Sequence, residues 1–368
     1  VLIGVAVLFA PAGQRVLEAL SEAVTGLLAY AQAGIDMVFG PLASDAVGFS
    51  FALNVLPVII FFAALMSVLY HVGIMQRLVS GAGWILHAVL GAGRVESLTA
   101  AANIFVGQTE APLVVKPYLE TITRPQLFAI MVSGMASVAG TVLAAYAQIG
   151  VSVDYLIAAS FMAAPGGLLM AKIIMPDDPG GAPVQDLLHP RSGRERAGNV
   201  IMAAADGARD GLHLALNIGA MLIAFVSLIA LLNGLLSSAG GLAGFEGLTL
   251  QTLLGYVFAP VMVLLSVPWE EARAAGAILG EKIVINEFVA YFSLSEQLDQ
   301  FSPRSQAVLT VALCGFANFS SIGILLGGLG GLIPGRMGEI ARFGLRAVLA
   351  ATLANLMSAA IAGLLFLG

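Results

Sequence analysis

Charge is scarce in this sequence. Asp, Glu, Lys and Arg make up 10% of its 368 residues, whereas 59% of the residues are hydrophobic. A soluble domain carries about 25% charged residues. A soluble protein of this length could not cover its surface with so few charges, so most of the exterior must face lipid. The net charge of −6 and the lack of a basic cluster argue against a nucleic-acid partner.

Cysteine and histidine are also rare. The single cysteine, Cys314, excludes an internal disulfide and a cysteine-based metal site. The four histidines are scattered and match no metal-binding motif. Ser133 and Ser137 lie four residues apart, but no histidine is placed to activate either hydroxyl. We therefore expect no enzyme and no cofactor.

Apolar segments long enough to span a bilayer recur along the chain. Five are continuous: 51–70, 127–145, 155–175, 212–236 and 345–367. A sixth, 307–333, is interrupted by Asn318, Ser320 and Ser321. The opening run 1–10 is shorter than the ~20 residues that a spanning helix needs. We interpret it as the tail of an earlier helix in a truncated chain.

Two shorter apolar stretches turn back at polar tips. The stretch 98–106 is followed by Gly107 to Glu110 and a second short apolar run. The runs 272–279 and 283–285 are followed by Asn286 and Glu287, and then by the short apolar run 288–292. Each pattern predicts two half-helices joined by a polar tip. Such re-entrant hairpins occur at membrane depth only where they are buried in protein or line a wet cavity.

The distribution of Lys and Arg predicts orientation. The connection 176–211 and the approach to the last helix are rich in arginine, whereas 146–154 and 233–252 contain no Lys or Arg. The first two connections are therefore expected in the cytoplasm and the last two outside, which places the C-terminus outside.

The two hairpins belong to an internal repeat. Pro125 follows Glu110 by 15 residues, and Pro303 follows Glu287 by 16. Each proline opens an interrupted helix, broken at 136–140 in the first half and 316–321 in the second. The predicted orientation makes the repeat inverted. Inverted repeats with broken helices are typical of secondary transporters. The sequence thus predicts an all-α membrane protein with two re-entrant hairpins and two interrupted transmembrane helices.

Glu110 and Glu287 are the strongest candidates for function, because carboxylates inside a membrane are costly. The alternative is a structural role, in a pair with Lys116 or Lys282 or as helix caps. Asn318 and Ser321 share a helical face and are also assigned to the site. Ser320 alone is assigned to hydrogen bonding between helices. Two acids without a nearby arginine pair favour a neutral polar substrate accompanied by a cation.

Four motifs carry a specific resemblance. They are Gly107-Gln108-Thr109-Glu110-Ala111-Pro112, Val267-Pro268-Trp269-Glu270-Glu271-Ala272, Asn286-Glu287-Phe288-Val289-Ala290-Tyr291 and Cys314-Gly315-Phe316-Ala317-Asn318-Phe319-Ser320-Ser321. In this order and spacing they resemble the concentrative nucleoside transporter family, over about 1–368.

The resemblance implies a division of the site. The nucleobase is expected at Gln108, Thr109, Glu110 and Val142. The ribose is expected at Glu287, Asn318 and Ser321, with Phe316 lining the site. A sodium ion is expected at Asn103, Val106, Ser137 and Val138.

The resemblance also implies sodium-coupled import of nucleosides by a homotrimer in the bacterial inner membrane, with a transport domain that moves past a scaffold like an elevator. The expected parts are scaffold helices at 1–83, a first transport repeat at 84–176, a cytoplasmic hydrophilic linker at 177–211, a scaffold helix with its external connection at 212–250, and a second transport repeat at 251–368.

Alternatives stay open at this point. Glu110 or Glu287 could couple transport to protons in place of sodium. The same architecture could carry a nucleobase or another neutral polar metabolite. A channel would give no uphill accumulation, and an intramembrane enzyme would need a catalytic pair or a metal site that we do not find.

Overall fold

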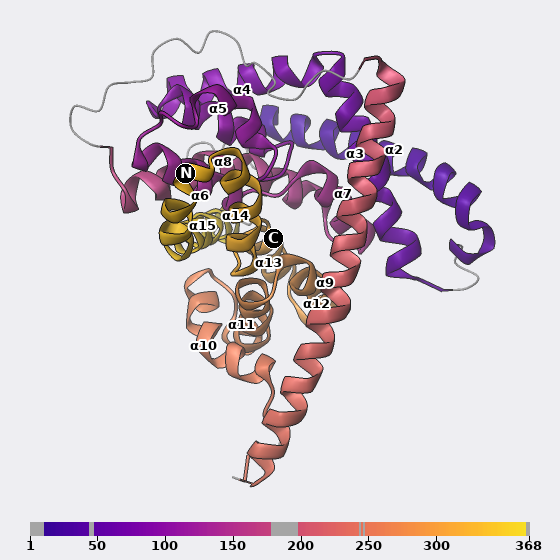
Figure 1. Cartoon of the computed structure of the whole chain (residues 1–368). Coiled ribbons are helices and arrows are strands. Elements are labelled where there is room, and N and C mark those ends of the chain that lie inside the picture. Colours follow the sequence, from indigo (N-terminus) through magenta and orange to yellow (C-terminus); the bar gives the residue numbers. More distant parts are fainter. Residues whose placement is uncertain (1–10, 44–47, 178–197, 243, 246, 366–368) are drawn as a thin grey trace.

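The computed structural model describes residues 11–43, 48–177, 198–242, 244–245 and 247–365, which contain helices and no strand. Figure 1 shows their arrangement. In chain order the elements are α2 (Pro11–Phe39), the 3₁₀ helix η1 (Gly40–Ala43), the π-helical η2 (Phe51–Val55), α3 (Leu56–His71), α4 (Ile74–Leu90), α5 (Arg94–Asn103), the 3₁₀ helix η3 (Ala111–Tyr118), α6 (Arg124–Ala136), α7 (Gly140–Gln148), α8 (Val153–Ile174), α9 (Val200–Leu242), α10 (Leu250–Leu264), α11 (Trp269–Val284), α12 (Glu287–Glu296), the 3₁₀ helix η4 (Leu298–Gln300), α13 (Pro303–Leu313), α14 (Ser320–Leu332), the 3₁₀ helix η5 (Pro334–Arg336) and α15 (Met337–Leu365).

The order of elements in the first half recurs in the second. A long helix (α3 or α9) is followed by a second helix, a pair of short helices, a broken helix and a final long helix (α8 or α15). The short pairs, α5–η3 and α11–α12, are the two predicted hairpins. The predicted breaks are confirmed between α6 and α7 and between α13 and α14. The inversion of the repeat and the re-entry of the hairpins stay predictions.

Local sequence explains where the broken helices begin. Thr123 caps α6: its hydroxyl accepts a hydrogen bond from the Gln126 amide at 3.3 Å, and its own amide donates to Gln126 Oε1 at 3.0 Å. Ser302 caps α13 by accepting from the Ser305 amide. Pro125 and Pro303 stand in the first turns of these helices, where the missing N–H is tolerated.

Two helix assignments need correction. The sequence prediction missed α2, which belongs to the candidate span Gly13–Ala43, because its charged first turns give that span the lowest mean hydropathy of the six. Helix α9 begins at Val200, well before the predicted start at Leu212, because Asp206, Arg209 and Asp210 break the apolar run without breaking the helix. The interpreted helix tail 1–10 and most of the predicted linker lie outside the described residues.

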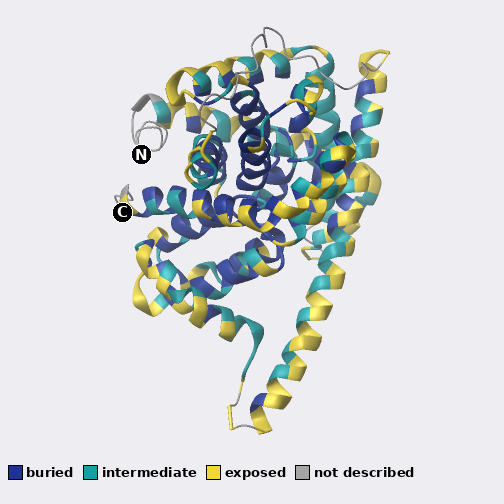
Figure 2. Ribbon diagram, turned by 60° about the vertical axis from the view of Figure 1, so that its left-hand side comes forward, coloured by how far each residue is buried: buried dark blue, intermediate teal, exposed yellow. Residues whose placement is uncertain are grey.

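The buried centre is built from the helices of the two repeats. Every residue of α6 from Pro125 to Ala136 is buried, and most of α5, α8 and α13 is buried as well. Figure 2 shows these dark blue helices in the middle of the molecule and exposed residues along the lower half of α9. The upper part of α9 crosses α3 closely at Gly207 and Gly211, where a Cβ would lie 2.6–2.8 Å from the backbone or side chains of α3.

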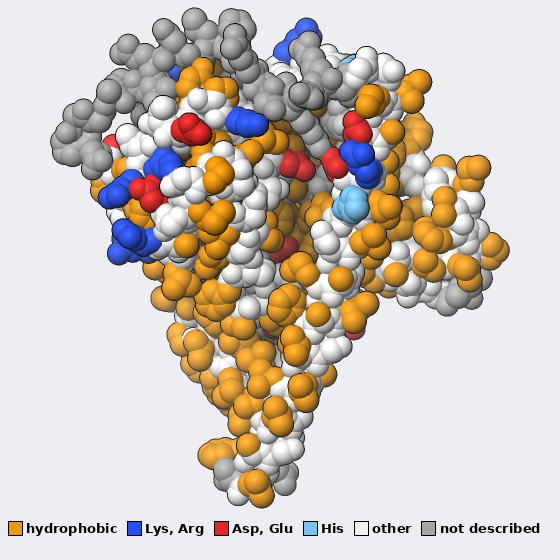
Figure 3. Space-filling model, viewed as in Figure 1, with side chains coloured by type: hydrophobic (Ala, Val, Ile, Leu, Met, Phe, Trp, Pro, Cys, Tyr) orange, Lys and Arg blue, Asp and Glu red, His pale blue; other side chains and the backbone are white. Residues whose placement is uncertain are grey.

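The described residues contain six helices that are long and apolar enough to cross a membrane, or seven if the bent pair α10–α11 counts as one span. At 1.5 Å per residue the 43 residues of α9 extend about 65 Å, twice the ~30 Å hydrocarbon core of a bilayer. In Figure 3 apolar side chains dominate the lower part of the visible face, and the charges gather in the upper part. The chain is an integral, multi-pass membrane protein.

Candidate functional site

The tip of the first hairpin is held by close backbone packing. Gln108 is buried beside α6, where a Cβ on Gly134 would lie 2.9 Å from Gln108 Cβ. Thr109 lies against α14, where a Cβ on Gly328 would come within 3.0 Å of the threonine side chain. Only glycine allows this approach, so both broken helices fix the position of the tip.

The tip of the second hairpin presents a carboxylate at the start of a helix. The Asn286 side chain caps α12 by accepting a hydrogen bond from the Val289 amide at 2.9 Å. Glu287 is the first residue of α12, where the helix dipole favours a negative charge. Its carboxylate is buried and accepts hydrogen bonds from Asn318 Nδ2 at 2.8 Å and from the Tyr146 hydroxyl at 3.3 Å.

The break in the second interrupted helix brings polar groups to this carboxylate. Asn318 Oδ1 accepts hydrogen bonds from the Ser321 amide at 2.9 Å and from the Ser320 hydroxyl at 2.7 Å. Gln108 of the first hairpin donates to the Ser321 hydroxyl at 3.4 Å. A network of side chains therefore connects the first hairpin, the second break and the second hairpin.

All eight residues predicted to bind substrate line one cavity of about 590 Å³: Gln108, Thr109, Glu110, Val142, Glu287, Phe316, Asn318 and Ser321. Its other wall is formed by α3 and the upper part of α9. In Figure 3 the molecule is hollowed beside the upper part of α9, with acidic side chains in the hollow. The cavity thus separates the two helices predicted as scaffold from the hairpins and broken helices predicted to move.

The four residues predicted to bind sodium lie behind the first tip. All four are buried, and Val106 alone lines the cavity. Asn103 Nδ2 donates to the Ser133 hydroxyl at 3.0 Å, while Asn103 Oδ1 is buried without a hydrogen-bond partner. The Ser137 hydroxyl donates to the Ser133 carbonyl at 3.0 Å. The oxygens of Asn103 and Ser137 are neutral, and Asn103 Oδ1 is left to accept. This arrangement fits a small monovalent cation. In the described part of the chain no cluster of His, Cys, Asp and Glu could hold a metal.

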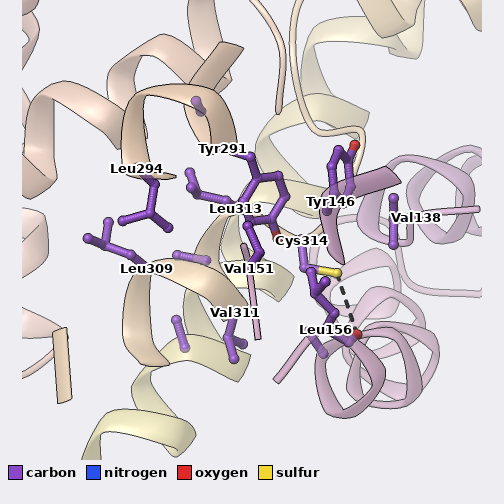
Figure 4. Close-up of a cluster of buried hydrophobic side chains, with 14 of the residues drawn as sticks. Val138, Tyr146, Val151, Leu156, Tyr291, Leu294, Leu309, Val311, Leu313 and Cys314 are labelled. Atoms are coloured by element: carbon purple, nitrogen blue, oxygen red, sulfur yellow. Dashed lines mark hydrogen bonds between the residues drawn. The ribbon is translucent and has the colours of Figure 1, made fainter. Parts of the chain in front are cut away.

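Sequence reasoning missed Tyr146. Its ring lies 4.8 Å from that of Phe288 and 4.4 Å from that of Tyr291, measured between centroids, so packing against α12 aims its hydroxyl at Glu287. Figure 4 shows Tyr146 and Tyr291 in the same buried cluster as Cys314. No local motif marks Tyr146, because its partner stands 141 positions away in the chain.

Asp206, Asp210 and Asn217 were also missed, and all three line the cavity from α9. Their spacing of four and seven residues places them on one helical face, which was the available signal. Ser320, assigned to helix packing, also lines the cavity. Lys282 donates hydrogen bonds to the Ala312 carbonyl and to Asn355.

Comparison with known proteins identifies the family. Residues 1–42 match the model described as "Na+ dependent nucleoside transporter N-terminus", 52–152 the model "Nucleoside recognition", and 155–363 the model "Na+ dependent nucleoside transporter C-terminus". The uncharacterised transporter YutK of Bacillus subtilis is 53% identical over 353 residues, covering 96% of this chain and 87% of the relative. The nucleoside permease NupC of Helicobacter pylori is 48% identical, covering 100% and 89%.

A solved structure supports the same conclusion. CNTnw in an inward-facing, substrate-bound state superposes with a TM-score of 0.93 at 48% identity, covering 98% of this chain and 88% of that one. The relatives named for an activity are transporters and permeases, not enzymes. On this evidence the chain belongs to the family of Na⁺-dependent nucleoside transporters.

Proposed function

We propose that this protein imports nucleosides into a bacterial cell by symport with sodium, through an elevator movement of its hairpins and broken helices. The observation that carries the proposal is the convergence of both hairpin tips and both helix breaks on one cavity, with the Glu287–Asn318 pair in its wall. Membership of the Na⁺-dependent nucleoside transporter family supports both the substrate class and the coupling to sodium.

Ribose is proposed to bind at the second tip. The Glu287 carboxylate accepts two hydrogen bonds from protein groups, and its oxygens have capacity for further donors. Ribose hydroxyls are such donors. The Ser321 hydroxyl and Phe316 complete this end of the cavity. A site built around hydroxyl groups rejects analogues that lack them, because its buried polar groups would then stay unpaired.

The nucleobase is proposed to bind at the first tip. Gln108 donates from its amide nitrogen to Ser321, while Gln108 Oε1 is buried without a partner. This free acceptor suits an N–H group on a base edge. Thr109 and Glu110 add further polar groups, and Val142 supplies an apolar surface for the ring.

Sodium is proposed to bind at Asn103, Val106, Ser137 and Val138. The unpartnered Asn103 Oδ1 is the observation that favours sodium over a proton, since a buried acceptor without a donor calls for a cation or a donor group. By linkage, the ion and the nucleoside must raise each other's affinity by the same factor.

The exposed apolar face of α9 is consistent with a scaffold that contacts lipid or other subunits. Ile223, Val226, Leu231 and Leu235 are all more than half exposed. We propose that the protein is a homotrimer in the bacterial inner membrane, with α3 and α9 in the fixed scaffold.

The decisive experiment is uptake of radiolabelled uridine into proteoliposomes under a sodium gradient or a pH gradient. We expect accumulation with sodium alone. Glu287→Gln should abolish it, because the amide nitrogen would face a donor, either Tyr146 or Asn318. The matched control is Glu296→Gln at the exposed end of the same helix, which should transport normally. Uptake driven by the pH gradient would refute sodium coupling, and no uridine uptake under either gradient would refute the substrate.

A single cysteine on the first hairpin tests whether that hairpin moves across the membrane, as the elevator proposal requires. Leu113 belongs to the first hairpin and lines the cavity, whereas native Cys314 is fully buried and should not react. We expect Leu113→Cys to react with an impermeant maleimide from the cytoplasmic side in one state and from the outside in another. Reaction from one side only, with or without sodium and uridine, would contradict the elevator.

A further inference from the structure

Lys282 is a fully buried cation for which the proposed transport mechanism has no role. It lies near the end of α11, with 0% relative exposure. Its ammonium group donates hydrogen bonds to the Ala312 carbonyl at 2.9 Å and to Asn355 Oδ1 at 2.8 Å. Ala312 lies in the last turn of α13, so the charge sits at the negative end of that helix dipole.

Asn355, on α15, joins the two broken helices. Its Nδ2 donates to the Ala136 carbonyl at 2.7 Å and to the Cys314 carbonyl at 2.8 Å. Ala136 is the last residue of α6, and Cys314 directly follows α13. One buried amide group therefore satisfies a backbone carbonyl at each of the two breaks, which interrupt helices in different repeats.

The two breaks also touch each other directly. The Phe316 amide donates to the Ser137 carbonyl at 3.2 Å. Gly315 has φ +149°, and a Cβ there would lie 2.5 Å from the Ala136 carbonyl oxygen and 2.7 Å from Asn355 Oδ1. Only glycine allows the second break to approach the first this closely.

This contact lies between the two ligand sites. On one side, Ser137 belongs to the proposed sodium site. On the other, the Asn318 amide donates to the Phe316 carbonyl at 2.9 Å, and the Asn318 side chain holds Glu287. A short chain of hydrogen bonds thus runs from Ser137 at the first break through Phe316 and Asn318 to the carboxylate proposed to bind ribose. Asn355 bonds both breaks beside this chain.

We propose that Asn355 and Lys282 are positioning residues that couple sodium binding to nucleoside binding. Bound sodium holds the backbone of the first break in one conformation. Asn355 then restricts the backbone of the second break as well, because its side chain forms hydrogen bonds to both breaks. Lys282 holds the Asn355 side chain in the orientation that makes both bonds. The inference rests on the proposed sodium site, and it assigns the coupling to residues that contact neither ligand.

The first test measures coupling itself. Purified protein in nanodiscs is titrated with uridine at zero and at saturating sodium, with choline as the replacement cation, and the ratio of the two dissociation constants is the coupling factor. Coupling factors of about 5 to 150 are usual. Asn355→Asp keeps the shape but removes both donated bonds, so we expect its factor to fall close to one. Lys282→Met should lower the factor in the same direction.

Ser358→Ala is the matched control. Ser358 lies one turn further along α15, is equally buried, and donates only to the Ala354 carbonyl of its own helix. Its coupling factor should equal that of the wild type. A merely structural role for Asn355 would weaken uridine binding equally with and without sodium, and an unchanged factor in Asn355→Asp would therefore overturn the proposal.

The second test needs no variant and so remains decisive if the substituted proteins fail to fold. Hydrogen exchange of the wild type is followed with sodium and without nucleoside. We expect sodium to slow exchange at the first break, 136–140, and also at the second break, 314–319. Protection of the first break alone would overturn the coupling role and leave the sodium site standing. Protection of neither break would overturn both.

Discussion

Gly328 on α14 provides a sharp test of the first hairpin tip. A Cβ at this position would lie 2.5 Å from Thr109 Cγ2, 2.9 Å from Thr109 Cβ and 3.3 Å from Thr109 Cα. Rotation of the threonine side chain relieves only the first of these contacts. Gly328→Ala must therefore move the hairpin backbone or strain α14, and either change disturbs the proposed nucleobase site.

The expected size of the change in KM follows from two opposing effects of the alanine side chain. Alanine in place of glycine favours a helix by up to ~1 kcal/mol. Overpacking in a tight interior costs about 1–3 kcal/mol. If the strain is expressed in nucleoside binding, a net 1–2 kcal/mol raises the KM for uridine about 5- to 30-fold. We expect this rise in sodium-driven uptake by proteoliposomes, with protein of unchanged oligomeric state.

The neighbouring Gly327 is the matched control. It lies on the same helix, and a Cβ there meets no atom within 4 Å. Gly327→Ala gains the helix preference without a clash, so its KM should equal the wild-type value and its Tm should be unchanged or slightly higher. Equal KM values for the two alanine variants would refute the assignment of Thr109 to the site.

Three further predictions concern the scaffold, the site and a helix start. Gly207→Ala should lower the Tm by several degrees, because the added Cβ would lie 2.6 Å from the Ala63 carbonyl oxygen and force α9 away from α3. An unchanged Tm in thermal melts would contradict this packing. Asn318→Asp should weaken uridine binding at pH 7 at least about 10-fold, since it sets a second carboxylate against Glu287. Wild-type affinity for uridine, measured by calorimetry, would contradict the proposed role of the Glu287–Asn318 pair in binding. Thr123→Ala should lower stability by about 1 kcal/mol with KM unchanged, because it removes the cap of α6 and touches no site residue.

The parts of the site that could be predicted from sequence are those with a local signal. The run Phe316 to Ser321 interrupts an apolar helix with polar residues, and the structure breaks the helix two residues earlier, at 314–319, with Ser320 opening α14. Glu110 and Glu287 stand out because carboxylates are rare among apolar segments. Such signals depend on neighbours in the chain, and the polar residues that they marked line the cavity: Glu110, Glu287, Asn318, Ser320 and Ser321.

The parts that could not be predicted depend on contacts between distant segments. Tyr146 is one aromatic residue among many in apolar helices until folding brings it to Glu287. Asn355 looks like an ordinary polar residue in α15, although it bonds carbonyls of Ala136 and Cys314. The start of α9 was misplaced for a different reason: Asp206 and Asp210 face a wet cavity, and a hydropathy argument counts such residues as loop.

The predicted inversion of the repeat places the two hairpins in opposite orientations in the membrane, and it can be tested with single cysteines. Thr121 and Gln300 stand at equivalent, exposed positions just before the first and second broken helices. Inversion predicts that they lie on opposite sides of the membrane. Native Cys314 is fully buried, so it should contribute no background.

An impermeant maleimide applied to intact cells should label Gln300→Cys at once and Thr121→Cys only after permeabilisation. Exposed Ser152 and Met202, on either side of α8, supply the external and cytoplasmic reference positions as cysteine variants. The reverse pattern at all four positions would invert the whole topology and preserve the repeat. Labelling of Thr121→Cys and Gln300→Cys from the same side would make the repeat parallel, and it would refute the inverted repeat predicted from the charge distribution.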